Sequence, residues 1–250
     1  YAYVANVGSN DVSVIDAASR KVVARIPAGA KAHGVTFSPD GKVAYIANVG
    51  SSNVSVIDTV TRKVIATIPA GRKAALAAFT PDGKRAFISN IQDGTCTIVD
   101  ASTHTPLGTV ATGKGAMGIE VSRDGKLVYE TEGNEDQISV IDVATNRVVH
   151  VFKFGHKEPH GLALTPDGSL ALVTNRGSAN VSVIDLTTNE ELTIIPVAPR
   201  PDIIVITPNG KYAHLTSREG KSMQTIDIAA RKVVATVPLG GDPHGIAVRP

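Results

Sequence analysis

The 250-residue chain contains no tryptophan, one cysteine and only 4% aromatic residues. A single cysteine, Cys96, excludes an internal disulfide and any metal centre made of several cysteines, and we expect it to be an inert buried thiol. No stretch approaches the roughly 18 consecutive apolar residues of a membrane-spanning helix, so we predict no membrane span. The 25 Lys and Arg nearly balance the 23 Asp and Glu. The formal net charge of +2 therefore does not by itself indicate nucleic-acid binding.

What the chain does contain is an internal repeat of about 42 residues. A Val-Ile-Asp string and its variants end at six aspartates, namely Asp16, Asp58, Asp100, Asp142, Asp185 and Asp227. A Pro-Asp-Gly turn and its variants recur with the same period, with glycines at positions 41, 83, 125, 168 and 210. We interpret the aspartates as acceptors for turn amides rather than as calcium ligands.

Each repeat has the pattern of four short strands. In one unit the predicted strands cover residues 33–38, 43–48, 54–58 and 63–68, which are rich in Val, Ile and Thr and are bounded by turn residues. No 10-residue segment keeps a helical period free of Gly and Pro. Four antiparallel strands per repeat are typical of one blade of a β-propeller, so we predict an all-β fold.

The two ends of the chain complement each other in this pattern. The chain begins in a second strand and ends in a first strand, which predicts a six-bladed propeller closed by N-terminal strands pairing with the C-terminal strand. A piece of a larger propeller is the alternative. We expect one domain over residues 1–250, and the blades are predicted at 32–70, 74–112, 116–154, 159–197, 201–239, and 243–250 together with 1–28.

The second strands carry a four-residue signature, seen as Tyr3-Val4-Ala5-Asn6, Tyr45-Ile46-Ala47-Asn48, Phe87-Ile88-Ser89-Asn90 and Leu172-Val173-Thr174-Asn175. Over its whole length the chain resembles the YVTN-repeat β-propellers, within the superfamily of surface-layer and haem d1 propellers. The resemblance implies an extracytoplasmic protein, whether periplasmic, secreted or on the cell surface. It does not fix an activity, because the family includes surface-layer components, binding proteins and relatives of haem d1 propellers.

Residues that break the repeat are the best candidates for function. The six equivalent positions at the start of the innermost strands are His33, Ala75, Met117, His160, Asp202 and His244. Since these differ in type, the repeat does not require them, and six inner strands converge on a central channel. We therefore predict a ligand site at the channel mouth, formed by His33, Met117, His160, Asp202, His244 and Glu132.

The three histidines among these residues could also bind a metal ion. His33, His160 and His244 are of the type that binds a transition metal, and one histidine could serve as a haem axial ligand. Haem d1 propellers, within the resemblance, place histidines around this channel. The simpler interpretation is an unliganded cluster bonded to backbone and water. No H-E-x-x-H, C-x-x-C-H or G-x-S-x-G motif is present, so the sequence requires no cofactor and assigns no catalytic residue.

Basic residues recur in the loops expected around the mouth, and they are Lys31, Arg72, Lys73, Lys114, Lys157, Arg176, Arg200 and Arg218. Such a rim attracts a small anionic ligand, although it can also be an ordinary solvated surface. The low aromatic content argues against a single-stranded nucleic acid as partner. Glu132 is open to several roles: salt-bridge partner, cation ligand, general base or part of a solvated loop.

The sequence thus favours a monomeric, extracytoplasmic propeller that binds a small anionic ligand or a protein partner. Two alternatives stay open. One is a metal- or haem-dependent redox protein that uses the channel histidines, and the other is a structural repeat domain of a larger cell-surface protein.

Overall fold

The computed structural model describes residues 1–248, which form 23 strands and no helix. None of these residues therefore provides a helix long and apolar enough to cross a membrane. The first sheet has three strands, β1 (Ala2–Asn6), β2 (Asp11–Asp16) and β3 (Lys21–Pro27). The second sheet has four, β4 (Ala32–Phe37), β5 (Val43–Asn48), β6 (Asn53–Asp58) and β7 (Lys63–Pro69).

The other four sheets also have four antiparallel strands in sequence order. The third contains β8 (Ala74–Phe79), β9 (Arg85–Asn90), β10 (Thr95–Asp100) and β11 (Thr105–Ala111). The fourth contains β12 (Ala116–Val121), β13 (Leu127–Glu132), β14 (Gln137–Asp142) and β15 (Arg147–Phe152). The fifth contains β16 (Pro159–Leu164), β17 (Leu170–Asn175), β18 (Asn180–Asp185) and β19 (Glu190–Pro196). The sixth contains β20 (Pro201–Ile206), β21 (Tyr212–Ser217), β22 (Ser222–Asp227) and β23 (Lys232–Pro238).

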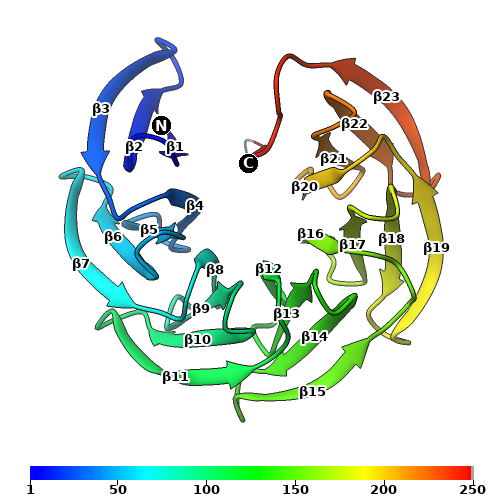
Figure 1. Ribbon diagram of the computed structural model, residues 1–250, viewed down its shortest axis with the longest axis horizontal. Helices are drawn as coiled ribbons and strands as arrows, with labels where there is room; N and C mark the ends of the chain where they lie inside the picture. The colour runs from blue at the N-terminus through cyan, green and yellow to red at the C-terminus, as the bar shows by residue number, and fades with distance from the viewer. Residues whose placement is uncertain (249–250) are drawn as a thin grey trace.

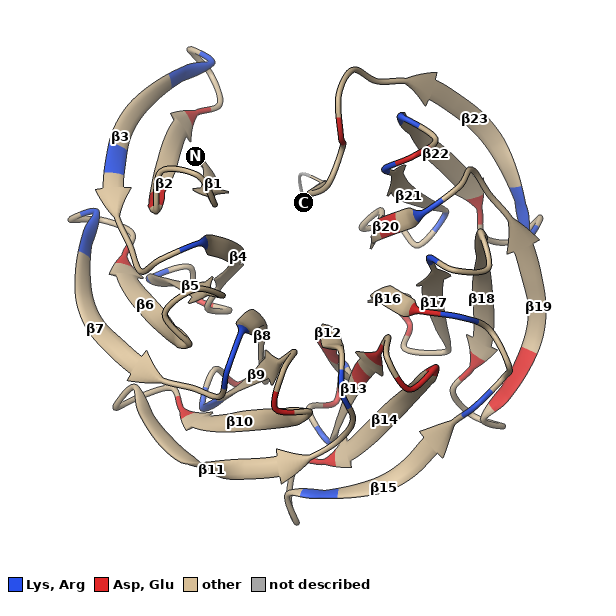
Figure 2. Ribbon diagram, viewed as in Figure 1, with Lys and Arg blue, Asp and Glu red and all other residues tan. Residues whose placement is uncertain are grey.

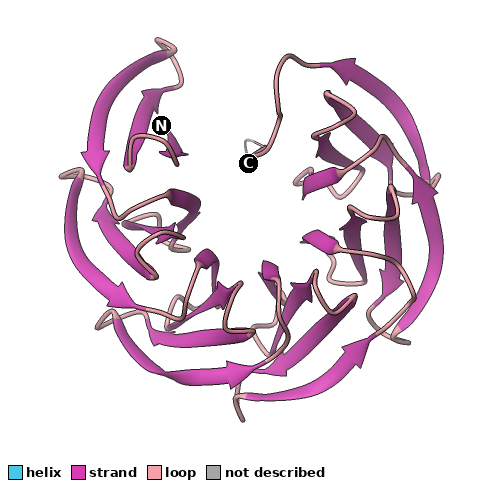
Figure 3. Cartoon of the chain, viewed as in Figure 1, coloured by secondary structure: helices cyan, strands magenta, loops and turns pink. Residues whose placement is uncertain are grey.

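The sheets are arranged radially around a central axis, as in a propeller (Figure 1). Strands β4, β8, β12, β16 and β20 lie nearest the axis, and the last strand of each sheet forms the outer edge. Figure 3 shows that loops alone connect these strands. The predicted all-β propeller with six repeated units is therefore confirmed.

Local sequence explains the turns within each sheet. Gly41, in the turn between β4 and β5, has a φ of +68°, which glycine adopts without strain. The repeated aspartates accept hydrogen bonds in the turns before the outer strands. Asp58, for example, accepts from the Thr61 amide at 2.6 Å and from its hydroxyl at 2.7 Å. The predicted structural role of these aspartates is confirmed for Asp58.

The core lies between neighbouring sheets. Tyr45, Val54 and Ile68 of the second sheet are fully buried and belong to one apolar cluster with Ile88 and Val99 of the third. The second and third strands of these sheets are buried on both faces because a sheet covers each side. Cys96 lies in this interior and is buried, as predicted.

The closure of the ring differs from the prediction in one respect. Strand β1 pairs with β2 alone, the first sheet has three strands, and residues 240–248 form no strand. Figure 1 shows the first sheet and the C-terminal segment on the two sides of an opening. Pro243 is not the cause, because Pro159 and Pro201, at the equivalent repeat position, begin the paired inner strands β16 and β20.

The C-terminal segment instead keeps the contact of an inner strand with the preceding sheet. The Thr216 hydroxyl donates to the His244 carbonyl at 2.7 Å. The equivalent Thr174 hydroxyl donates to the Asp202 carbonyl at 2.6 Å. His244 therefore lies where the second residues of the other inner strands lie, although it is in no sheet.

Candidate ligand site at the channel mouth

The candidate site is formed where the inner strands begin. His33, Met117, His160 and Asp202 are each the second residue of an inner strand. The strands approach one another closely because glycine follows three of these positions, as Gly34, Gly118 and Gly161. A Cβ atom on Gly161 would lie 2.3 Å from the Asp202 carbonyl oxygen. Small residues at these crossings allow the side chains at the mouth to meet.

Asp202 is the centre of the site and is fully buried. Its Oδ1 lies 2.5 Å from Arg176 Nη2 and 3.0 Å from His160 Nδ1. Its Oδ2 lies 3.7 Å from His244 Nε2 and 3.8 Å from Arg218 Nε. Four cationic or titratable side chains thus surround one carboxylate.

These neighbours decide the ionisation of the cluster. Burial alone would raise the pKa of Asp202, but the His160 contact and the Arg176 charge outweigh it and lower that pKa to about 2. Burial lowers the pKa of His160 below its usual range. Near neutral pH, Asp202 is therefore an anion and His160 is uncharged.

The site has a buried floor and a solvent-facing layer. The side chains of Asp202, His160 and Arg176 are 0%, 5% and 11% exposed, whereas those of Arg218 and His244 are 33% and 36% exposed. The His244 ring meets the half-buried His33 ring edge-on, with 5.1 Å between centroids. A ligand that arrives from solvent would meet Arg218, His244 and His33 first.

Four polar atoms of the floor lack a hydrogen-bond partner. They are both ring nitrogens of His160, Arg176 Nε and Asp202 Oδ2, which are buried and make no hydrogen bond to any residue within 1–248. Since buried polar atoms are nearly always satisfied, they mark places where water or polar ligand groups fit. The floor can therefore both donate and accept hydrogen bonds.

The basic rim is largely neutralised by acidic residues that sequence reasoning did not single out. Arg72 lies 2.5 Å from Asp93, and Lys157 lies 2.6 Å from Asp136. The members of each pair are 21 residues apart, half of one repeat, which is the signal that could have identified them. Figure 2 shows the acidic and basic positions along the ribbon.

The arginines nearest the mouth are paired as well. Arg200 contacts Glu158 at 3.3 Å, and the Arg218 guanidinium binds both carboxylate oxygens of Asp242, with Nε to Oδ1 at 2.7 Å. Lys31, Lys73 and Lys114 form no salt bridge with other residues of the described chain.

Glu132 is placed differently from the other predicted site residues. It is fully buried beside Gln137, and its carboxylate oxygens have no hydrogen-bond partner in the described chain. Glu130, two residues earlier on β13, is equally buried and unpartnered, and sequence reasoning did not single it out. Burial raises the pKa of Glu130 to about 8. Burial and the nearby Glu130 raise that of Glu132 to about 9. Glu132 is therefore part of a protonated interior pair.

The remaining predicted positions contribute less. Met117 is half-buried, and its carbonyl accepts a hydrogen bond from the Ser89 hydroxyl at 3.0 Å. Residues 1–248 contain no group of three or more His, Cys, Asp or Glu side chains arranged to hold a metal ion. The geometry therefore gives no support to His33, His160 and His244 as a metal site.

Fold and site together define a β-propeller with a polar, partly buried charge cluster at its channel mouth. The chain belongs to the family described as "Lactonase, 7-bladed beta-propeller", whose model matches residues 1–195. The model of the YNCE-like beta-propeller matches residues 162–249. The predicted relationship to β-propeller repeat proteins is confirmed, although the described residues form six sheets rather than seven.

Solved structures share this fold. The chain is similar to Kuenenia stuttgartiensis hydrazine synthase, with a TM-score of 0.88 and 21% identity over 96% of this chain and 84% of that chain. It is also similar to a functionally unknown protein from Desulfotomaculum acetoxidans DSM 771, with a TM-score of 0.82 and 16% identity over 94% of this chain and 78% of that one. At these identities the likeness shows the fold alone. No curated protein matches the chain.

Proposed function

We propose that this propeller is a binding scaffold that takes a small carboxylate-bearing molecule at its channel mouth. The observation that carries the proposal is the convergence of His33, His160, Asp202 and His244 at one place. These positions vary from repeat to repeat, so blade formation does not explain them. Ligand sites in propellers and barrels commonly lie at such mouths, where strands and loops converge.

The chemistry of the solvent-facing layer of the site favours a carboxylate as the ligand group. The planar Arg218 guanidinium already binds the Asp242 carboxylate in a two-pronged contact, which is the geometry that arginine offers to carboxylates. His244 and His33 lie beside it and can supply further hydrogen bonds. In this proposal the ligand carboxylate replaces Asp242 on Arg218, and its other polar groups reach the unpartnered floor atoms.

Calorimetric titration with a panel of small mono- and dicarboxylates, each beside its uncharged amide, tests the proposal. We expect carboxylates to bind, amides to bind much more weakly, and Arg218→Gln to reduce carboxylate affinity about tenfold or more. Arg123→Gln is the matched control, because Arg123 binds the Pro166 carbonyl outside the mouth cluster. Equal affinities for carboxylates and amides, or no loss in Arg218→Gln, would count against the proposal.

Hydrolysis of a lactone is the second candidate, supported by the family description and by the contact of His244 with the Asp202 carboxylate. In this reaction His244 accepts a proton from water, the oxygen of that water attacks the lactone carbonyl, and the carbonyl–ring oxygen bond breaks as the ring oxygen takes the proton from His244 and leaves as an alcohol. The product is a hydroxy acid, whose carboxylate suits Arg218. Proton release from simple five- and six-membered lactones, followed in wild type and His244→Gln, tests it. Equal rates in both proteins would exclude this role of His244.

The alternative functions and the expected location of the protein are tested separately. Absorption spectra and elemental analysis of natively purified protein address the redox alternative, and stoichiometric haem or metal would displace the binding proposal. A protein partner is the competing occupant of the mouth, as it would be for a cell-surface structural domain. A location outside the cytoplasm rests on the resemblance to YVTN-repeat proteins, and fractionation of native cells tests it.

A further inference from the structure

A cavity lies further along the same inner strands, separate from the side-chain cluster at the mouth. It has a volume of about 460 Å³ and is lined by β4, β8, β12, β16 and β20. Most lining side chains are aliphatic, as Leu76 and Ile203 are, and two are the aromatic rings of Phe37 and Phe79. The volume falls in the range of small-molecule sites, roughly 300–1,000 Å³.

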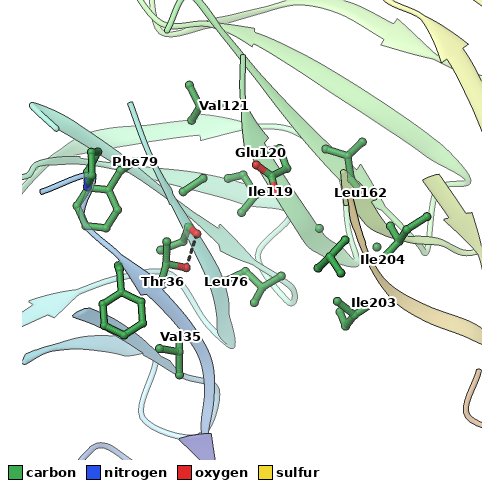
Figure 4. A pocket seen from close by; sticks show the side chains of 17 residues that line it. Val35, Thr36, Leu76, Phe79, Ile119, Glu120, Val121, Leu162, Ile203 and Ile204 are labelled. Carbon is green, nitrogen blue, oxygen red and sulfur yellow. Dashed lines mark hydrogen bonds between the residues drawn. The ribbon is translucent and has the colours of Figure 1, made fainter. Parts of the chain in front are cut away.

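One charged side chain faces this apolar lining. Among the described residues that line the cavity, Glu120 of β12 is the sole charged one, and Figure 4 shows it among apolar neighbours. Within residues 1–248 the Glu120 carboxylate forms no salt bridge and no hydrogen bond. The equivalent positions hold the neutral residues Thr36, Ala78, Ala163 and Val205. The repeat therefore does not require an acid here.

A carboxylate in apolar surroundings is unfavourable until a cation compensates it. Burial raises the pKa of Glu120 to about 7, which is the signature of a carboxylate without a counter-ion. Glu120 is nevertheless only half-buried, so a molecule in the cavity can reach it.

We propose that this cavity binds a small organic cation, an ammonium group on an apolar body, with the Glu120 carboxylate as its counter-ion. The apolar lining receives the body of the ligand, and the single carboxylate selects its charge. This site shares no side chain with the carboxylate site at the mouth, and neither proposal depends on the other.

Calorimetry at about pH 8, where both partners are charged, tests the proposal with three probes of similar shape. These are benzylammonium, benzyl alcohol and benzoate. We expect benzylammonium to bind about tenfold or more tightly than benzyl alcohol, and benzoate to bind most weakly. Equal affinities for the three probes, or no binding of benzylammonium at about 10 mM, would overturn the proposal.

Two variants locate the binding. Glu120→Gln removes an uncompensated charge without changing shape, so it should fold and lose the preference for benzylammonium. The exposed Glu219→Gln is the matched control and should keep that preference. Val205→Phe partly fills the cavity and should weaken both benzylammonium and benzyl alcohol. A preference that survives in Glu120→Gln, or unchanged affinities in Val205→Phe, would place the binding elsewhere.

Discussion

Arg176 Nη2 lies 2.5 Å from Oδ1 of Asp202, and this contact joins two neighbouring sheets at the channel mouth. Arg176 follows β17 in one sheet, and Asp202 lies in β20 of the next. Both side chains are almost completely withdrawn from solvent. The pair therefore links the two sheets at the mouth, and its Asp202 carboxylate also contacts His160 and His244.

Removing the Asp202 charge leaves the Arg176 cation buried without its main partner. We expect Asp202→Asn to lower the free energy of unfolding by about 3 kcal/mol, because breaking a buried pair is far more costly than breaking an exposed one. Asp242→Asn, at a 60% exposed carboxylate, should change it far less, because solvent screens an exposed ion pair. Urea unfolding of both variants measures the difference. Equal small effects would mean that the Asp202 cluster does not stabilise the fold.

The close approach of the inner strands leads to a second prediction, which concerns stability. A methyl group on Gly161 would meet the Asp202 carbonyl oxygen at 2.3 Å and the Thr174 hydroxyl at 3.0 Å. Gly161→Ala should therefore destabilise the protein by about 2 kcal/mol or more, through strand displacement. Gly8→Ala is the control, since nothing lies within 4 Å of the added carbon. Thermal unfolding that ranks the two variants equally would rule out tight packing at this crossing.

The interior glutamates predict an unusual dependence of stability on pH. The folded-state pKa values of Glu130 and Glu132 are raised to about 8 and 9, so their protonated forms are favoured in the folded protein. This stability is fully present below the ordinary glutamate pKa and is lost as pH rises through the raised values. We expect each of the two glutamates to contribute a loss of about 3 kcal/mol between roughly pH 5 and pH 8.

Chemical unfolding at several pH values tests this prediction. Glu130→Gln should remove much of the slope, whereas Glu135→Gln should leave it unchanged because Glu135 lies exposed in the following loop. A slope that is the same in wild type and Glu130→Gln would show that these carboxyls do not control the pH dependence.

The sequence predicts the blades well, because strand alternation and Pro-Asp-Gly turns are local signals repeated at each unit. Alignment of repeats also identifies His33, His160, Asp202 and His244 as residues that the fold does not need. In the structure His160 and His244 both lie against the Asp202 carboxylate. The same alignment suggested a mouth position for Glu132, but this repeat position is interior, since the equivalent Asn48, Asn90 and Asn175 are buried as well.

Other features depend on contacts that no local pattern contains. The acidic partners of the rim, such as Asp93 and Asp136, come from loops half a repeat away. The absence of a β1 pairing with the C-terminal segment is not visible in the sequence either, because the Pro-His-Gly string at residues 243–245 also begins the paired strand β16.

In the proposed binding mode, Arg218 receives a ligand carboxylate in place of the Asp242 carboxylate. Calorimetric titration of Asp242→Asn with the carboxylate that wild type binds most tightly measures whether this exchange occurs. Because the substitution removes an internal competitor, we expect affinity to rise about fivefold to tenfold, and to be lost when Arg218→Gln is added. Unchanged affinity in Asp242→Asn together with undiminished binding in the double variant would contradict the account.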